Sequence, residues 1–148
     1  MNNIEIFTSK TPVTSKEKEA IVDFLHIHLD QFGDPREDIC KAVNYALKKT
    51  NSFGGYVLRL SDGKQIIGAV VVNRTGMDGY IPENILVYIA IDKNYRGQGL
   101  GKKIMQKAIE TADGDVALHV EPDNPARKLY EKLGFTSKYI EMRYKKTV

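Results

Sequence analysis

The chain has 148 residues, enough for one domain with a hydrophobic core and too few for two ordinary ones, so we expect residues 1–148 to form a single domain. Its composition, 42% hydrophobic and 28% charged, is typical of a folded soluble protein. The net charge is only +3 because 22 basic residues are interspersed with 19 acidic ones, which argues against a nucleic-acid partner.

The sequence carries no sign of export, membrane insertion or metal binding. Its N-terminus lacks the apolar segment of a signal peptide, and no apolar run approaches the ~18 residues of a membrane span. The single cysteine, Cys40, has no Cys or His at metal-binding spacing. His26 and His28 lie two residues apart on a predicted helix and therefore point in different directions. We expect a cytoplasmic protein without disulfides or metal.

The N-terminal part of the chain predicts one strand and two helices. Residues 4–7 predict a short strand. A capping box from Thr14 to Glu17 then starts a helix that we expect to end at Gly33. A second helix follows directly, because Asp34 suits the N-cap and Pro35 the first helical position.

The rest of the chain predicts a mixed sheet. Asp62 and Gly63 form the turn of a hairpin, and the longer loop 74–83 is the expected mobile rim. Strands are predicted at residues 56–60, 65–73, 85–91, 116–120, 135–139 and 141–145, with helices after residue 100 and from 125 to 134. The expected fold class is α/β (α+β), a mixed central sheet flanked by helices on both faces, in the order β-α-α-β-β-β-α-β-α-β-β.

The most informative stretch is ILVYIAIDKNYRGQGLGKK, residues 85–103, which predicts a strand, a loop and a helix. The first turn of a helix has backbone N–H groups without helical partners and the positive end of the helix dipole, so it stabilises an anion. Glycines at 97, 99 and 101 remove the Cβ atoms that would keep a phosphate away from those N–H groups. The loop therefore predicts a pyrophosphate site, although a glycine-rich helix start is the plainer alternative.

Two common phosphate loops do not match this stretch. The nucleoside-triphosphatase loop needs Gly-Lys followed by Ser or Thr, and the dinucleotide fingerprint needs a glycine where this chain has Lys102. In contrast, Arg96-x-x-Gly99-x-Gly101 resembles the acyl-coenzyme A loop of the GCN5-related N-acetyltransferase (GNAT) family. Residues 123–135, DNPARKLYEKLGF, are similar to the fourth conserved block of that family, and match its LYEKLGF core letter for letter. The resemblance covers residues 56–139 well, whereas the first fifty residues match only in having two helices.

The resemblance implies that acetyl-CoA binds between two parallel strands, here residues 85–91 and 116–120. It places the pantetheine arm at Ile89, Ala90 and Ile91. It also implies a pyrophosphate site built mainly from backbone N–H groups of Arg96, Gly97, Gln98, Gly99, Leu100, Gly101 and Lys102.

Tyr130 stands where the family has its general acid, which protonates the departing thiolate. Free phenols and thiols have pKa values of about 10 and 8.5, so a tyrosine is protonated at neutral pH and can supply this proton. The alternative is that its ring only packs in the core. Asn124 corresponds to a pantetheine contact shifted by one residue, because Asp123 holds the usual place; it is equally suited to cap the next helix.

The general base is the least determined residue. The amine must lose a proton before or during its attack. Glu83, at the mouth of the strand 85–91, is the expected base, and the alternative is a solvated loop residue. His119 and Glu121 on the neighbouring strand are further candidates, and Tyr88 could hold a water molecule.

The expected function is direct N-acetyl transfer from acetyl-CoA to a primary amine of a small molecule or peptide, because no cysteine is placed to carry the acetyl group. Acidic residues near the junction of the first two helices would attract a cationic acceptor; they are Asp30, Asp34, Glu37 and Asp38. The alternatives are a non-catalytic CoA-binding sensor or assembly module, and a plain interaction domain. A homodimer paired through the final strand is possible.

Overall fold

The computed structural model describes residues 2–147, which form one five-stranded sheet in the order β1-β2-β3-β4-β5. Neighbouring strands are antiparallel, except that β4 and β5 are parallel. The strands are β1 (Asn2–Phe7), β2 (Gly55–Asp62), β3 (Gln65–Arg74), β4 (Asn84–Ile91) and β5 (Val116–Leu118). The mixed sheet expected from the sequence is confirmed.

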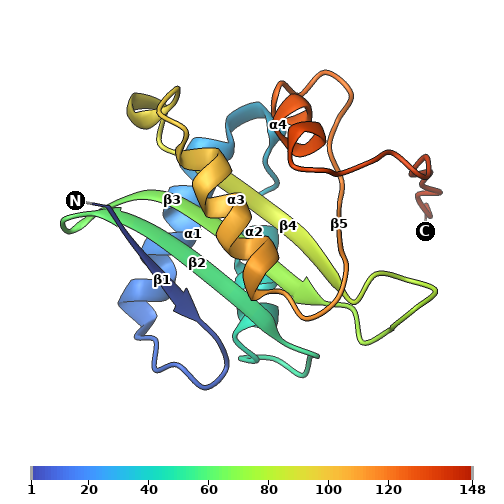
Figure 1. The fold of residues 1–148 in the computed structure, drawn as a ribbon. Coiled ribbons are helices and arrows are strands. Elements are labelled where there is room, and N and C mark those ends of the chain that lie inside the picture. Colours follow the sequence, from blue (N-terminus) through green and yellow to red (C-terminus); the bar gives the residue numbers. More distant parts are fainter. Residues whose placement is uncertain (1, 148) are drawn as a thin grey trace.

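Helices cover both faces of this sheet (Figure 1). The helices α1 (Ser15–Leu29) and α2 (Arg36–Ala46) lie on one face, and α3 (Leu100–Thr111) and α4 (Ala126–Lys132) belong to the other. Two short 3-10 turns follow α1 and β4, η1 (Asp30–Phe32) and η2 (Lys93–Tyr95). Each face has its own buried cluster, which we call the α1-side core and the α3-side core. Among residues 2–147 no helix is long and apolar enough to cross a membrane.

The predicted start of α1 is confirmed, whereas its end differs. The Thr14 hydroxyl accepts from the Glu17 N–H, and the Glu17 carboxylate accepts from the Thr14 N–H, both at 3.0 Å. The helix stops at Leu29 rather than Gly33, because Asp30 has a φ of 56° and leaves the helical region.

The expected N-cap of α2 is wrong. The cap residue is Pro35 and the helix begins at Arg36. Asp34 instead accepts a hydrogen bond from the Tyr88 hydroxyl at 2.5 Å. A phenol that is almost entirely buried requires an acceptor for its O–H, and this tertiary contact outweighs the local cap.

The hairpin between β2 and β3 is confirmed. Asp62 pairs with Gln65, and Gly63 supplies the positive φ of 62° that the two-residue turn requires. At the other end of the chain, β5 ends at Leu118 rather than at residue 120.

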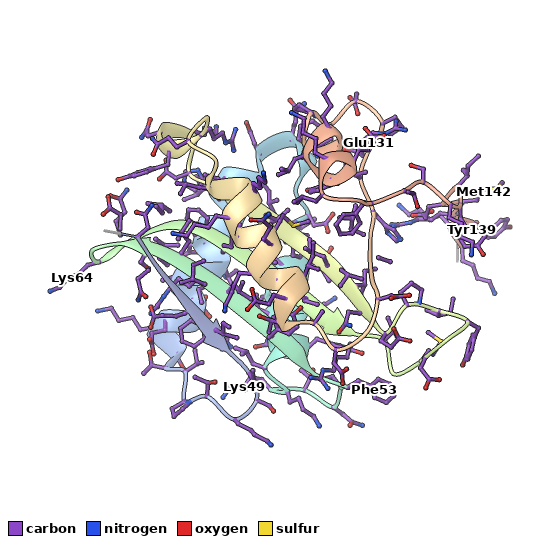
Figure 2. All side chains as sticks on the ribbon, viewed as in Figure 1. Lys49, Phe53, Lys64, Glu131, Tyr139 and Met142 are labelled. Atoms are coloured by element: carbon purple, nitrogen blue, oxygen red, sulfur yellow. The ribbon has the colours of Figure 1, made fainter. Side chains whose placement is uncertain are left out.

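The last two predicted strands are not formed. Residues 133–147 contain no strand. Tyr139, Ile140, Met142 and Tyr144 are 82–90% exposed, and Figure 2 shows Tyr139 and Met142 on the C-terminal segment, away from the sheet. An alternating pattern forms a strand only where it pairs with another strand. The residues of this segment do not pair with β5.

Tyr56 tests the connection between the sheet and α3. Its side chain is 2% exposed, and its hydroxyl donates to the Ala108 carbonyl at 2.7 Å. We expect Tyr56→Phe to lower the free energy of unfolding by about 1 kcal/mol, the usual net contribution of one hydrogen bond. Urea denaturation measures this difference, and Tyr139→Phe, at an exposed position, is the control that should match the wild type.

The stability of Tyr56→Phe should also depend on pH differently from that of the wild type. Burial raises the pKa of Tyr56 from 10.0 to about 12. As pH rises from about 10 to 12, the unfolded chain loses this proton while the folded chain keeps it, so stability falls. The phenylalanine variant should therefore lose less stability over this pH range. Parallel stability–pH curves for the two proteins would contradict the assignment.

Candidate functional site

The parallel strands β4 and β5 pair over only three positions. Asn84–Leu86 of β4 lie beside Val116–Leu118 of β5, and β4 then continues to Ile91 without this neighbour. The register between β3 and β4 shifts after Val71, which leaves Val87 of β4 without a partner of its own. Such a bulge bends its strand. Beyond the bulge the two strands diverge (Figure 1).

Beyond Leu86, some backbone groups of β4 point toward the side where β5 no longer pairs with it. The Asp92 N–H donates to the Ile67 carbonyl of β3 at 2.8 Å. Groups of an antiparallel strand alternate in direction, so Ala90 also faces β3, while Ile89 and Ile91 face away from it. The Ile91 carbonyl accepts from Arg96 Nε at 3.1 Å. Both groups of Ile89 and the N–H of Ile91 are thus directed where a ligand could bind them.

The glycine loop leads directly from this strand end into α3. Gly97 and Gly99 have φ angles of 79° and 77°, and no atom lies within 4 Å of a Cβ built at either residue. Gly99 is the N-cap of α3 and provides no side-chain cap, so the first N–H groups of the helix have no side-chain acceptor. The loop therefore has the geometry predicted for an anion site.

Gly101 has a different role from the other two glycines. A Cβ at this position would lie 3.3 Å from Leu129 of α4, so its absence lets the two helices approach. Leu100 is buried in the α3-side core, which leaves only its backbone available to a ligand. The side chains of Gln98 and Lys102 are exposed.

Arg96 is directed away from the loop. Besides the bond to Ile91, its Nη2 donates to the His28 carbonyl at the end of α1, at 3.0 Å. His28 Nε2 lies 3.6 Å from the buried carboxylate of Asp92. Burial lowers the pKa of His28, with Asp92 opposing the effect. This cluster ties the end of β4 to α1. The sequence pattern did not reveal it, because Arg96 and His28 are 68 residues apart.

Tyr130 lies in the α3-side core, 7% exposed, with its ring centroid 6.1 Å from that of Phe135. Burial raises the pKa of its hydroxyl to about 12. Within residues 2–147 this hydroxyl makes no hydrogen bond. The ring therefore packs in the core, and the hydroxyl keeps its proton at neutral pH.

Asn124 has the geometry of a cap. Its Oδ1 accepts from the Ala126 N–H at 2.9 Å, at the start of α4. This contact supports the capping alternative, although the amide nitrogen of the same side chain makes no hydrogen bond to the described residues.

Glu83 anchors the loop before β4. One carboxylate oxygen accepts from the Asp115 N–H at 2.7 Å and the other from the Gly79 N–H at 2.9 Å. These backbone donors, Gly79 first, lower the pKa of Glu83. A carboxylate whose two oxygens both accept from the backbone is a weak proton acceptor, so the contacts favour a structural role.

The predicted acidic residues are largely engaged with other groups. Asp34 accepts from Tyr88, Asp30 lies 3.3 Å from Lys93, and Asp38 lies 3.6 Å from Lys41. Only Glu37 makes no such contact within the part of the chain that the structure describes. In residues 2–147 no group of three or more His, Cys, Asp or Glu side chains could hold a metal ion.

Known proteins resemble this chain over most of its length. The acetyltransferase (GNAT) family model matches residues 21–135. N-alpha-acetyltransferase 30 of Schizosaccharomyces pombe is 28% identical over 132 residues, covering 78% of this chain and 82% of that protein. Ribosomal protein bS18-alanine N-acetyltransferase of Haemophilus influenzae is 35% identical over 106 residues, covering 68% and 69%.

A solved structure shares the fold. An aminoglycoside N-acetyltransferase in complex with CoA has a TM-score of 0.69 at 16% identity, covering 100% of this chain and 97% of its own. Since the family model spans residues 21–135, well over half of the chain, the protein belongs to the acetyltransferase (GNAT) family and is an acyltransferase.

Proposed function

We propose that this enzyme transfers the acetyl group of acetyl-CoA directly to a primary amine of a small molecule or peptide while both substrates are bound. Members of its family use acetyl-CoA. The observation that carries the proposal is the divergence of β4 from β5 next to the N-terminus of α3. It brings unpaired backbone groups of a strand and of a helix start to the same edge of the sheet.

Acetyl-CoA would bind along this edge. Its pantetheine amides can form hydrogen bonds with the backbone groups of Ile89 and Ile91. A longer β5 would have paired with the same groups. Its pyrophosphate suits the backbone N–H groups of residues 97–102, where Gly97 and Gly99 leave open space. Arg96 would act by holding the loop against β4 and α1 rather than by touching the phosphates. Ala90 would not itself contact acetyl-CoA, because its backbone faces β3 and its side chain is buried in the α1-side core.

Tyr130 would supply the proton for the sulfur. Its raised pKa keeps the hydroxyl protonated at neutral pH, so it can donate a proton to the sulfur as the C–S bond breaks. Because a thiol is more acidic than this phenol, the phenolate is the stronger base and regains a proton that the amine loses. Its helix, α4, packs beside α3 on the face where the glycine loop begins. Cys40 lies in α2 on the opposite face, which supports direct transfer without an acetylated cysteine.

The proposal is tested by measuring CoA release with a thiol reagent, using acetyl-CoA and a panel of primary amines. The panel contains a polyamine, an amino sugar and peptides with a free N-terminus or a lysine. Thiol release that depends on one of these amines, with an acetylated product of the expected mass, supports the proposal. Binding of acetyl-CoA by calorimetry without transfer to any amine favours the non-catalytic sensor instead.

Tyr130→Phe removes only the hydroxyl and leaves the packed ring. We expect kcat to fall about 10²-fold, the usual size of a general-acid contribution, while the Kd of acetyl-CoA and the melting temperature stay near wild type. Steady-state kinetics, calorimetry and thermal melting measure the three quantities. Unchanged kcat in the phenylalanine variant would remove Tyr130 from the chemistry.

Gly99→Ala tests the pyrophosphate site. Alanine at a φ of 77° costs about 1–2 kcal/mol of strain, and its methyl group would project into the space assigned to the phosphate. Gly79→Ala is a matched control, because Gly79 has a φ of 74° and equally open surroundings in a loop of its own. Both variants should lose similar stability, but only Gly99→Ala should weaken acetyl-CoA binding, by about 10-fold or more. Equal affinities of the two variants would contradict the site.

Glu83→Gln separates the structural role of Glu83 from its proposed role as base. We expect a lower melting temperature at neutral pH with kcat nearly unchanged, because a loop anchor is lost. The pKa of Glu83 is lowered in the folded protein, so its contribution to stability is present above its ordinary pKa of 4.5 and disappears as pH falls below it. The difference in melting temperature between the wild type and Glu83→Gln should therefore vanish as pH falls below 4.5. A large loss of kcat at unchanged stability would instead identify Glu83 as the base.

A further inference from the structure

His28 lies near the C-terminal end of α1, next to the segment that joins β4 to the glycine loop. Its imidazole Nε2 is 3.6 Å from the Asp92 carboxylate, and its side chain is 16% exposed. Its backbone carbonyl accepts from Arg96 Nη2 at 3.0 Å. Asp92 and Arg96 are the two ends of the segment 92–96, so a single residue of α1 contacts this segment at both ends.

Asp92 shapes the backbone of that segment. Its Oδ1 accepts from the Asn94 N–H at 2.8 Å, and its carbonyl accepts from the Tyr95 N–H at 2.9 Å, which starts η2. The other carboxylate oxygen, Oδ2, is the one next to His28. Because one oxygen holds η2 and the other faces the imidazole, a change at His28 acts on the backbone that leads into Gly97.

The surroundings of His28 suit a neutral imidazole. The ring of Phe24 packs against it, with centroids 4.5 Å apart. Nδ1 is buried and makes no hydrogen bond to any residue from 2 to 147. The Asp92 carboxylate favours the tautomer with the proton on Nε2, so a second proton would have to go to Nδ1. It would create a buried N–H without an acceptor, which is unfavourable.

The charged groups around the ring act in both directions. The pKa of His28 is lowered first by burial, and the cations of Arg96 and Lys93 add to this effect, whereas Asp92 opposes it. The Lys93 ammonium is itself 3.3 Å from Asp30 of η1. The balance favours the neutral ring, so its contribution to the folded structure is present above the ordinary pKa of 6.5 and is lost at lower pH.

From this arrangement we propose that His28 is a positioning residue for acetyl-CoA binding. The neutral imidazole holds Asp92, and with it the start of the glycine loop, in the conformation that accepts the pyrophosphate. A protonated ring would leave this position, so the loop would shift and the affinity for acetyl-CoA would fall. The inference rests on the coenzyme site proposed above, and it does not depend on which amine receives the acetyl group.

Calorimetry of acetyl-CoA binding between about pH 8 and pH 5 tests the proposal with three full-length proteins. We expect the Kd of the wild type to rise about 10-fold relative to that of His28→Gln as pH falls below 6.5. Glutamine keeps an N–H donor for Asp92 and does not titrate. His26→Gln, the same substitution at an exposed position of α1, is the matched control and should follow the wild type. Titration of the coenzyme phosphates affects all three proteins equally and cancels in the ratios of Kd.

A second measurement uses the wild type alone and does not depend on the folding of a variant. If the neutral form of His28 favours binding, then bound acetyl-CoA must in turn lower the pKa of His28. NMR titration of the assigned imidazole signals, with and without acetyl-CoA, measures this change. The pKa of His26 should be the same in both samples.

The outcomes separate this inference from the proposed function. Equal pH dependence of the wild type and His28→Gln overturns the role of His28, and so does an equal pKa of His28 in the free and bound enzyme. A wild type that does not bind acetyl-CoA at neutral pH overturns the coenzyme site and this inference together. A pH dependence that His28→Gln abolishes supports the inference even if no amine is acetylated, a result that would overturn only the transfer.

Discussion

The constraint on which the site depends is the short pairing between β4 and β5. Three residues of β5 are enough to align the two strands, and the bulge at Val87 then turns β4 away. A longer β4–β5 pairing would have given the backbone groups of Ile89 and Ile91 hydrogen-bond partners and left no gap between the two strands. The incomplete ladder instead leaves polar groups in a fixed direction, supported from behind by β3.

Fixed backbone groups suit a large and flexible cosubstrate. Binding through backbone N–H and C=O groups costs little conformational entropy on the protein side, because strand and helix already hold them. In the proposed function the glycine loop would extend the same principle to the phosphates, because a helix start provides partial positive charge without a basic side chain. Arg96 contributes to this rigidity, since it bonds to both the end of β4 and the end of α1.

The two faces of the sheet make different contacts. The α3-side core holds Tyr130 and brings α4 close to α3 through Gly101. The α1-side core carries Tyr88, whose bond to Asp34 connects the middle of β4 with the start of α2.

Local patterns in the sequence determined the hairpin at Gly63, the capping box of α1 and the glycine loop before α3, because each depends on neighbouring residues. The mixed sheet was expected from the order of the predicted strands and helices, whereas its pairing joins residues far apart in the chain. Local patterns could not determine the bulge at Val87, the partner of Asp34 or the direction of Arg96. Each of these depends on contacts between residues far apart in the chain, as does the failure of residues 133–147 to form strands. The position of His119 beside Glu141 likewise follows from how the chain packs, since 22 residues separate the two in sequence.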